Sequence, residues 1–296
     1  MKEKKIIALG FFDGVHAGHQ ALLRECRSLA HRLGVTAAAL TFAAHPDTLV
    51  FGKTPGLINT AEDRALLLRR AGMDQVLVLP FDKTVMTMPW QEFFRDLLEE
   101  QDAAGLVCGH DFRFGNRGEG TAALLRDACK DAGIPCIVVP EQKIDGITIS
   151  STYIRTLLEE GRMGQAARFL GHPHMLSGTV LPGRQLGRTL GIPTANLSFP
   201  QGVLCPKKGV YACKVFFDGE EHIAVTNIGT RPTVGGTGIT VESWLPDFSG
   251  DLYGKRLEVE FHEFIRPERR FADLDEMRRE IRKNAEQTRL FFREPC

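Results

Sequence analysis

Residues 10–19 read GFFDGVHAGH and come directly after an apolar run. We expect a strand over Ile6–Phe12, a tight turn at Asp13-Gly14 and a helix whose first turn carries His16 and His19. A strand that enters a helix through a glycine turn presents free backbone N–H groups at the positive end of the helix dipole, which suits a phosphate. Two imidazoles at the same place add donors that can follow a moving negative charge. The stretch therefore predicts phosphate chemistry on a nucleotide.

The spacing of His16 and His19 also allows another interpretation. Residues three apart lie on one face of a helix, so the two imidazoles could hold a metal ion. No third ligand of the HExxH type lies nearby in the sequence, which favours phosphate contact over zinc. The other residues expected to bind phosphate in this stretch are Gly10, Phe12, Asp13, Gly14 and Gly18.

The first half of the chain, up to about Gly171, alternates short apolar runs with helical patterns. Strands are expected over residues 6–12, 35–42, 75–79, 105–109 and 135–139, and helices over residues 19–33, 62–71, 90–101 and 121–132. This alternation predicts an α/β domain with a Rossmann-like parallel sheet that is covered on both faces. Ligands of such sheets bind at the carboxyl ends of the strands, and polar motifs follow the first, second and fourth expected strands.

The pattern changes after residues 171–173. Strands without intervening helices are expected over residues 175–181, 211–217, 222–227, 240–245 and 256–264, and one helix is expected over residues 274–291. Asp218-Gly219, between two of these strands, is a hairpin turn signal. The second half therefore predicts a small antiparallel β-barrel with a C-terminal helix. We expect two domains, residues 1–171 and 172–296.

Composition narrows the partners and the compartment. A chain of 296 residues with 43% hydrophobic residues is long enough for two packed domains. Its formal net charge of zero gives no sign of a nucleic-acid partner or of an anionic membrane surface. No segment reads as a signal peptide or is long enough to span a bilayer. Seven cysteines without a close CxxC pair predict reduced thiols and a cytoplasmic protein, and the sequence does not specify an oligomeric state.

Four motifs in the first half resemble those of one family. The HxGH pattern of residues 16–19, with Asp13-Gly14 before it, is similar to the nucleotidyltransferase signature of the FMN adenylyltransferase module in bacterial-type bifunctional riboflavin kinase/FAD synthetases. The segments TFAAHP at 41–46, GHDFRFG at 109–115 and ISSTYIR at 149–155 resemble further motifs of that family, although Ala44 replaces its usual proline. The resemblance extends over essentially the whole chain.

The resemblance implies adenylyl transfer, in which a phosphate oxygen of FMN attacks the α-phosphorus of ATP and pyrophosphate leaves. No enzyme nucleophile is needed, so catalysis consists of positioning and of neutralising charge on the phosphate oxygens. His16 and His19 would contact the ATP phosphates, and Arg155 would clamp them with its planar guanidinium. The β- and γ-phosphates would be held at a helix start by Ser150, Ser151 and Thr152, which could otherwise serve only as a helix cap.

Three further residues are implied to hold the nucleoside or the flavin. Asp111 would hold the adenosine or flavin side, although an aspartate at this place could simply form a turn. His45 would lie near the flavin phosphate and Arg113 would assist there. Without the resemblance, His45 could be a strand exit and Arg113 a solvated loop residue.

Residues 178–196, GTVLPGRQLGRTLGIPTAN, form a second dense motif. Its glycines let the backbone approach a bulky anion closely, but the P-loop lysine and the GxGxxG spacing are absent. The stretch resembles the riboflavin kinase signature, a glycine loop followed by PTAN. The resemblance implies that Thr194 and Asn196 bind Mg²⁺ and the nucleotide phosphates. The ATP-binding set of this motif is completed by Gly183, Gly187, Arg188 and Gly191.

Glu242, in the segment TVESWL, matches the base of the same kinase family. A kinase that acts on a primary alcohol needs a base near the hydroxyl, and Glu242 would accept the proton as the oxygen attacks the γ-phosphorus. By itself, a lone strand glutamate is expected to face solvent. Two further segments, NIGTRPT at 227–233 and RPERRF at 266–271, resemble flavin-side motifs and imply contacts from Arg231, Arg266, Glu268 and Phe271.

We therefore expect a two-headed enzyme: the barrel would convert riboflavin and ATP to FMN, and the N-terminal domain would convert FMN and ATP to FAD, with Mg²⁺ implied for both. Two alternatives stay open. A monofunctional adenylyltransferase whose barrel only binds flavin is suggested by Val234 and Trp244, where the chain departs from the family pattern. A flavin-sensing regulator would show damaged phosphate motifs, and a regulator of transcription would also need a basic surface.

Overall fold

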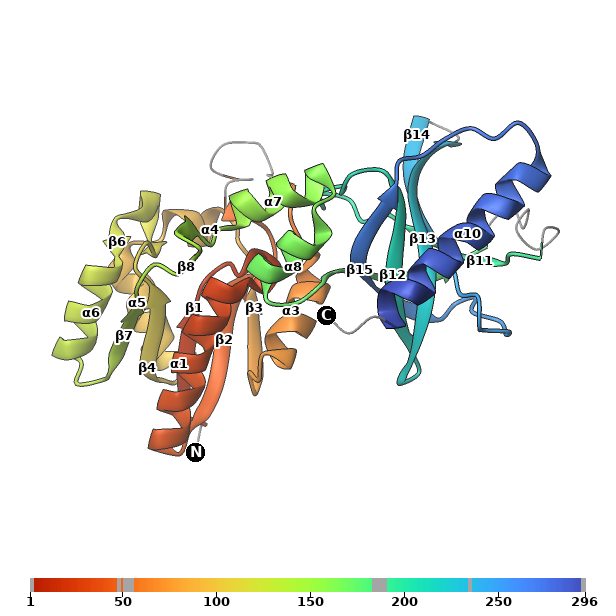
Figure 1. Ribbon diagram of the computed structural model, residues 1–296. Helices are drawn as coiled ribbons and strands as arrows, with labels where there is room; N and C mark the ends of the chain where they lie inside the picture. The colour runs from red at the N-terminus through yellow and green to blue at the C-terminus, as the bar shows by residue number, and fades with distance from the viewer. Residues whose placement is uncertain (1–2, 47–48, 50–55, 183–190, 234–235, 294–296) are drawn as a thin grey trace. The chain divides into compact units, whose positions relative to one another are not determined.

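The computed structural model describes residues 3–46, 49, 56–182, 191–233 and 236–293, and of residues 231–233, 236 and 237 it describes the backbone alone. Contacts divide the chain into two compact units, Met1–Ser151 and Thr152–Cys296. Figure 1 shows the first unit as a sheet with helices and the second as a barrel with a long helix. None of the described helices is both long enough and apolar enough to cross a membrane.

The first unit is built on a parallel sheet with the strand order β3-β2-β1-β4-β7. Its strands are β1 (Lys5–Leu9), β2 (Thr36–Phe42), β3 (Gln75–Leu79), β4 (Ala103–Gly109) and β7 (Cys136–Val139). Between them lie α1 (Ala17–Leu33), α3 (Ala61–Arg70), α4 (Lys83–Thr87), α5 (Trp90–Glu99) and α6 (Ala122–Asp131). Short turns and hairpins complete the unit, namely η1 (Asp13–Val15), β5 (Arg113–Phe114), η2 (Asn116–Gly118), β6 (Gly120–Thr121), β8 (Lys143–Ile144) and β9 (Ile147–Thr148).

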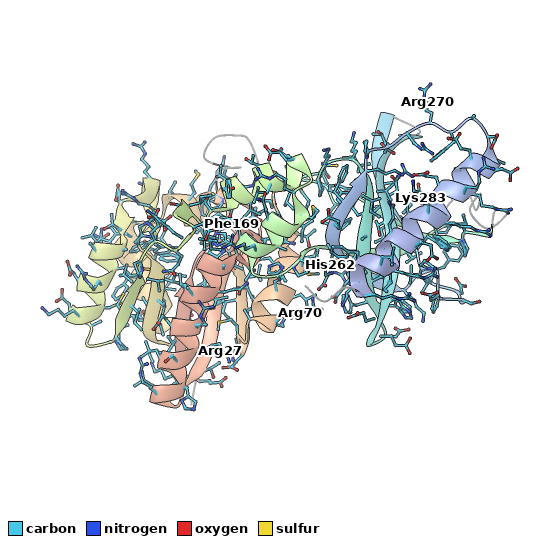
Figure 2. The ribbon with its side chains drawn as sticks, in the orientation of Figure 1. Arg27, Arg70, Phe169, His262, Arg270 and Lys283 are labelled. Carbon is cyan, nitrogen blue, oxygen red and sulfur yellow. The ribbon has the colours of Figure 1, made fainter. Side chains whose placement is uncertain are left out.

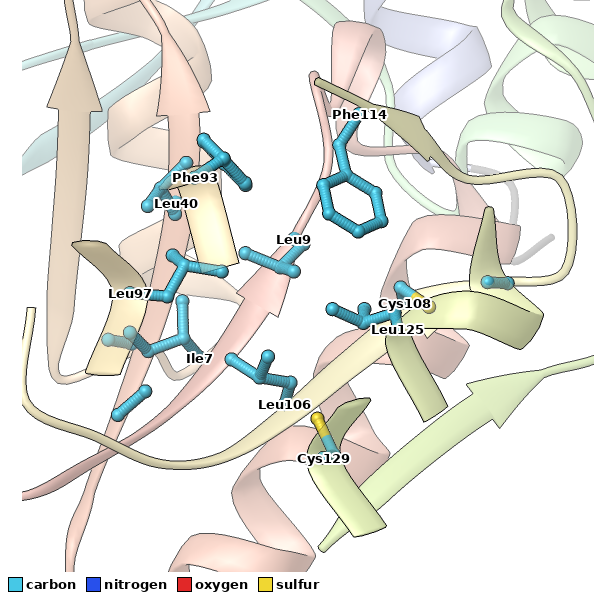
Figure 3. Close-up of a cluster of buried hydrophobic side chains, with 13 residues drawn as sticks. Ile7, Leu9, Leu40, Phe93, Leu97, Leu106, Cys108, Phe114, Leu125 and Cys129 are labelled. Atoms are coloured by element: carbon cyan, nitrogen blue, oxygen red, sulfur yellow. The ribbon is translucent and has the colours of Figure 1, made fainter. Parts of the chain in front are cut away.

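Successive residues of the central strand β1 are buried, which shows that both faces of the sheet are covered. One face packs on α5 and α6, and Figure 3 shows Ile7 and Leu9 of β1 within this cluster, close to Leu97 and Leu106. The helix α1 packs against β1, β2, β4 and β7, and the Cys26 thiol of α1 donates to the carbonyl of Ile6 at 3.3 Å. The expected Rossmann-like α/β unit is therefore confirmed.

The second unit contains a closed antiparallel barrel with the strand order β10-β11-β14-β13-β12-β15. The strands are β10 (His174–Leu181), β11 (Thr194–Ser198), β12 (Gly209–Phe217), β13 (Glu220–Thr233), β14 (Gly236–Trp244) and β15 (Arg256–Arg266). The helices are α7 (Ser151–Glu160, whose first residue ends the first unit), α8 (Met163–Leu170) and α10 (Leu274–Arg293). The expected barrel with a C-terminal helix is confirmed, and α10 packs against β12 and β13 (Figure 1).

Turns fix the ends of β12 and β1. Phe217 pairs with Glu220, and the two residues between them, Asp218 and Gly219, have φ values of 50° and 82°, as a two-residue hairpin turn of the primed type requires. The first strand differs from the expectation of residues 6–12, because β1 ends at Leu9 and the chain leaves it through a turn.

Candidate active sites

The loop between β1 and α1 has an unusual backbone. Phe12, Gly14 and Val15 have φ values of 59°, 77° and 41°, all in the left-handed region. Only glycine adopts this region at little cost, and a β-branched residue such as Val15 rarely does. The carbonyl of Val15 accepts from Gln20 Nε2 at 3.1 Å, which ties this strained turn to the first turns of α1. Strain of this kind collects at functional sites, where the surrounding structure fixes it.

Side chains from distant segments hold this loop in place. Thr41, fully buried on β2, donates its hydroxyl to the carbonyl of Phe11 at 2.7 Å, and the Ser151 hydroxyl donates to the carbonyl of Asp13 at 3.0 Å. The Asp13 carboxylate is itself buried and accepts from the backbone N–H of Ile58 at 2.9 Å. The structure thus places Asp13 as a residue that fixes the loop, with its carboxylate engaged by the backbone.

The two histidines form a stacked pair at the start of α1. His16 lies just before the helix as its N-cap, and its Nδ1 accepts from the backbone N–H of His19 at 3.2 Å. The expectation that His16 belongs to the first helical turn is therefore wrong by one position. The ring centroids lie 3.5 Å apart, with 11° between the planes. Gly18 makes room for this arrangement, because a Cβ there would approach His16 Nδ1 to 3.2 Å.

Burial keeps His19 neutral at physiological pH. Burial lowers its pKa well below the ordinary value, and the charges of His16 and Arg64 lower it further. The Nδ1 atom is buried without a hydrogen-bond partner in the part of the chain that the structure describes. Phe12, buried beside it, contacts the ring edge-on at 5.2 Å between centroids. Two parallel imidazoles so close together cannot both carry a charge without strong repulsion.

The ends of β2 and β4 carry the other residues expected near the nucleoside and flavin. His45, which follows β2, contacts the Phe11 ring edge-on with 4.5 Å between centroids, so it lies at the same loop as the histidine pair. Asp111 is exposed beyond the end of β4. Arg113 on β5 is also exposed, and its Nη1 donates to the carbonyl of Gly118 at 3.4 Å.

The serine–threonine motif spans the boundary between the units. Ser150 and Ser151 belong to the first unit, where Ser151 bonds the loop as described above. Thr152 and Arg155 belong to the second unit and lie on the first turns of α7, with Thr152 exposed and Arg155 half-buried.

The barrel unit contains a cavity of about 620 Å³. Glu242 lines it from β14, and the strand register places Asn196 of β11 and Asn227 of β13 directly opposite Glu242 on either side. Residues that face each other across strands project from the same face, and all three line the cavity. Thr194 lies two positions before Asn196, and its carbonyl accepts from Asn196 Nδ2 at 3.1 Å. The structure thus brings the expected base and the PTAN pair together.

The three described flavin candidates, Arg266, Glu268 and Phe271, also line the cavity. The centroid of the Phe271 ring lies 5.6 Å from the guanidinium of Arg266 and 4.8 Å from that of Arg269, whereas Arg270 points away from the ribbon (Figure 2). Burial lowers the pKa of Arg266. Glu268 accepts from Asn227 Nδ2 at 3.5 Å. Asn227 pairs with Glu242 across the strands, so this hydrogen bond connects a flavin candidate to the neighbour of the expected base.

Ionic contacts anchor Arg266 and Arg269 to α10. Arg266 donates to Asn284 Oδ1 from Nε at 3.2 Å and from Nη2 at 3.0 Å, and it pairs with Glu280 at 3.3 Å. Arg269 pairs with Glu280 at 3.1 Å. Sequence reasoning missed Arg269 and Asn284 as cavity residues, because both stand among charged or polar neighbours that read as solvent-facing.

Some expected kinase residues lie outside the described part of the chain. These are Gly183, Gly187 and Arg188, and the side chain of Arg231 on β13 is also not described. Gly191 is exposed and has a φ of 69°, a conformation that favours glycine.

Two family models match the chain, one for each half. The model described as FAD synthetase matches residues 1–153, and the model described as riboflavin kinase matches residues 170–292. The first model covers the stacked histidines of the N-terminal unit, and the second covers the cavity of the barrel.

Curated relatives resemble the chain over nearly its full length. The bifunctional riboflavin kinase/FMN adenylyltransferase of Listeria monocytogenes is 34% identical over 97% of this chain and 92% of the relative. The protein of the same name from Escherichia coli K12 is 36% identical over 98% of this chain and 94% of the relative. Among solved structures, one described as a macrolide-efflux protein from Streptococcus pneumoniae is 29% identical, with a TM-score of 0.84 over 98% of this chain and 95% of that chain.

Proposed function

The chain belongs to the family of bifunctional riboflavin kinase/FMN adenylyltransferases, and from this premise we propose how its residues divide the two reactions. The protein is a transferase that phosphorylates riboflavin to FMN with ATP and then adenylylates FMN to FAD with release of pyrophosphate. Riboflavin, FMN and ATP are its small-molecule substrates. Neither the monofunctional enzyme nor the regulator is favoured, because both halves match a catalytic family.

Adenylyl transfer is assigned to the first unit, and the stacked pair of His16 and His19 at the start of α1 is the observation that carries this assignment. A phosphate oxygen of FMN forms a bond to the α-phosphorus of ATP, and the bond from that phosphorus to the bridging oxygen breaks. His16, His19 and the backbone N–H groups at the helix start bind the phosphates and stabilise the charge that builds on their oxygens. The strained loop and the four hydrogen bonds that hold it keep these donors in place before the substrate arrives.

Several assignments in this site rest on the family motifs. Ser150, Ser151, Thr152 and Arg155 are proposed to bind the β- and γ-phosphates, and Gly10, Phe12, Gly14 and Gly18 to shape the loop around them. Asp13 is proposed to act by holding this loop, since its carboxylate already accepts from Ile58. His45 is proposed to lie near the flavin phosphate, where its contact with Phe11 supports it, while Asp111 and Arg113 are proposed at the nucleoside and flavin end.

Riboflavin phosphorylation is assigned to the cavity of the barrel, where Glu242 lies in register with Asn196 and Asn227. Glu242 accepts the proton of the ribityl hydroxyl while the hydroxyl oxygen bonds to the γ-phosphorus of ATP, and ADP leaves. Arg266, Glu268 and Phe271 are proposed to hold the flavin ring, because they line the same cavity as Glu242. Arg231 is proposed to assist the flavin end, and Gly183, Gly187, Arg188 and Gly191 to bind the nucleotide.

The donor set beside Glu242 fits Mg²⁺. Thr194 offers a hydroxyl oxygen and Asn196 a carbonyl oxygen, both neutral and hard, and both line the cavity. The described residues contain no group of three or more His, Cys, Asp or Glu side chains that could hold a metal ion, so an ion here would take its other ligands from phosphates and water. Thr194 and Asn196 would hold it, and the bound ion would neutralise charge on the phosphates.

Two further assignments are proposals as well. We place the boundary between the two catalytic domains after Gly171, which ends α8 with a φ of 78° shortly before β10 begins. The described cysteines, Cys26, Cys108, Cys129, Cys136, Cys205 and Cys213, are free thiols, which supports a cytoplasmic location.

One assay tests the central assignment. The purified protein is incubated with riboflavin, ATP and Mg²⁺, and the flavins are separated by chromatography. We expect FMN to appear first and FAD to follow. FMN without FAD would exclude the role of the first unit, and FAD formed only from supplied FMN would exclude the role of the barrel.

A further inference from the structure

Arg64 on α3 is a fully buried cation that the sequence motifs do not include, and it is the bulkiest of the fully buried side chains described. Its Nη2 donates to the carbonyl of Phe42 at the end of β2. Its guanidinium carbon lies 4.1 Å from the centroid of the Phe11 ring, within the range of a cation–π contact. Nε and Nη1 are buried and have no hydrogen-bond partner among the residues that the structure describes.

This burial is expensive for the fold. Burial lowers the pKa of Arg64 to about 10, and nearby Asp13 raises it, so the guanidinium stays charged at neutral pH. A buried charge destabilises a fold unless it is paired and fully hydrogen-bonded. Each donor without a partner adds a further penalty. A leucine or methionine would fill the space without the free-energy cost of a buried charge. A cation at this position therefore indicates a functional role that packing does not explain.

The residues that Arg64 contacts adjoin the proposed phosphate site. Phe11, under the guanidinium, also contacts His45. Phe42, which accepts its hydrogen bond, ends β2 three residues before His45. The charge of Arg64 also acts on His19. The cation therefore lies next to the loop that joins β1 to α1, at the end of β2.

We propose that Arg64 is a positioning residue of adenylyl transfer, a buried permanent cation that supplies positive potential to the phosphate site. The inference rests on the proposed function of the first unit. A fixed charge in a site that excludes water stabilises developing negative charge without reorganisation during the reaction. In the free protein, the charge of Asp13 compensates only in part for the burial of the guanidinium. The bound phosphates of ATP and FMN would add the remaining negative charge.

The charged groups around His19 make the proposal testable. His16 acts on it from the start of α1 and Arg64 from α3, while Asp13 of the loop acts on Arg64. Removing the charge of Arg64 removes one cause that lowers the pKa of His19. We therefore expect the pKa of His19 to rise in a neutral variant, while burial and His16 continue to lower it.

The test compares Arg64→Met, Arg64→Gln and Arg64→Lys with the matched control Arg69→Met, an exposed arginine of the same helix. The pKa of His19 is read from an NMR pH titration, in which its ring resonance is the one absent from His19→Gln. FAD formation from supplied FMN and FMN formation from riboflavin are measured on the same samples. Arg64→Gln removes the charge but keeps a polar side chain with an N–H donor, so it serves where Arg64→Met does not fold.

We expect both neutral variants to raise the pKa of His19, and to lower kcat for FAD formation by at least about tenfold, with FMN formation unchanged. Arg64→Lys keeps the charge and should hold the pKa near that of the unmodified protein and restore part of kcat. Two results together would overturn the proposal: the pKa of His19 is unchanged in the neutral variants, and their activity falls only as far as their lower melting temperature explains. Absence of FAD formation in the unmodified protein would instead refute the proposed function, and the NMR titration would still test Arg64.

Discussion

His16 and His19 stack face to face, with 3.5 Å between ring centroids and 11° between ring planes, and a backbone hydrogen bond from His19 to His16 Nδ1 locks the pair. His16 caps the helix, and His19 is kept neutral mainly by burial, with its Nδ1 buried as well. Because each ring fixes the position of the other, a change at either one disturbs both. The pair acts as a rigid unit at the positive end of α1.

Gly18 is the residue on which this geometry depends most directly. A Cβ at position 18 would lie 3.2 Å from His16 Nδ1, so Gly18→Ala should push the imidazole away and weaken the cap. We expect FAD formation to fall by about 10- to 100-fold while FMN formation is retained. The control is Gly164→Ala, which also alters the second residue of a helix but meets no atom within 4 Å. Equal activity of the two variants would contradict the role of the stacked pair.

Glu242 gives the reverse separation of the two activities. Glu242→Gln keeps the size of the side chain but removes the proton acceptor, so FMN formation should fall by about 10²- to 10⁴-fold. FAD formation from supplied FMN should persist, because that reaction is assigned to the other unit. Glu260→Gln is a matched control, since Glu260 is also a half-buried strand glutamate of the barrel and pairs with His262 outside the cavity. Loss of both activities in Glu242→Gln would argue against two separate sites.

The alternation of strands and helices predicted the first unit well. The strand over residues 75–79 has the bounds expected from its apolar run, because turn residues enclose it on both sides. The strand expected over residues 6–12 is shorter, since Phe11 and Phe12 look like strand residues but Phe12 adopts a left-handed backbone. That conformation is imposed by tertiary contacts such as the bond from Thr41, which no local pattern contains.

The sequence was less informative where function and packing compete. The barrel strand β11 (Thr194–Ser198) was not expected, because glycines and prolines precede it and only Ala195 and Leu197 show the buried alternation of a strand. The same segment was nevertheless assigned chemistry through its resemblance to PTAN. Arg64 was missed entirely, since an arginine after Glu62 and Asp63 reads as part of a solvated helix face. Only the three-dimensional structure shows that it is buried.

Trp244 gives a direct optical test of the barrel cavity. It lines the cavity two positions after Glu242, and the chain contains only one other tryptophan, Trp90 of the first unit. In a Trp90→Phe background, riboflavin should quench the emission of Trp244 in a saturable way, because an aromatic side chain in this wall can stack on the flavin ring. Trp244→Leu should raise KM for riboflavin by roughly 3- to 10-fold. Quenching that does not saturate would show that Trp244 lies away from the bound flavin.

His174 makes the stability of the barrel depend on pH. It is buried on β10 beside Phe261, and neither ring nitrogen has a hydrogen-bond partner within the described segments. Burial, and to a lesser degree the charge of His172, lowers its pKa from 6.5 to about 3. The unfolded chain therefore binds the proton more readily than the folded chain, so the stability present above pH 6.5 is lost as the pH falls toward 3. Between pH 6.5 and 3, the free energy of unfolding falls by about 1.4 kcal/mol for each pH unit.

Thermal unfolding at several pH values between neutral and acidic measures this effect. In the Trp90→Phe background, the emission of Trp244 follows the barrel unit alone. We expect its melting temperature to fall as the medium is acidified, and His174→Leu to flatten that dependence, because leucine takes up no proton and leaves no ring nitrogen unpaired. His172→Leu is the matched control and should leave most of the slope, since burial is the larger cause of the lowered pKa. The same slope in all three proteins would mean that another group governs the acid sensitivity of the barrel.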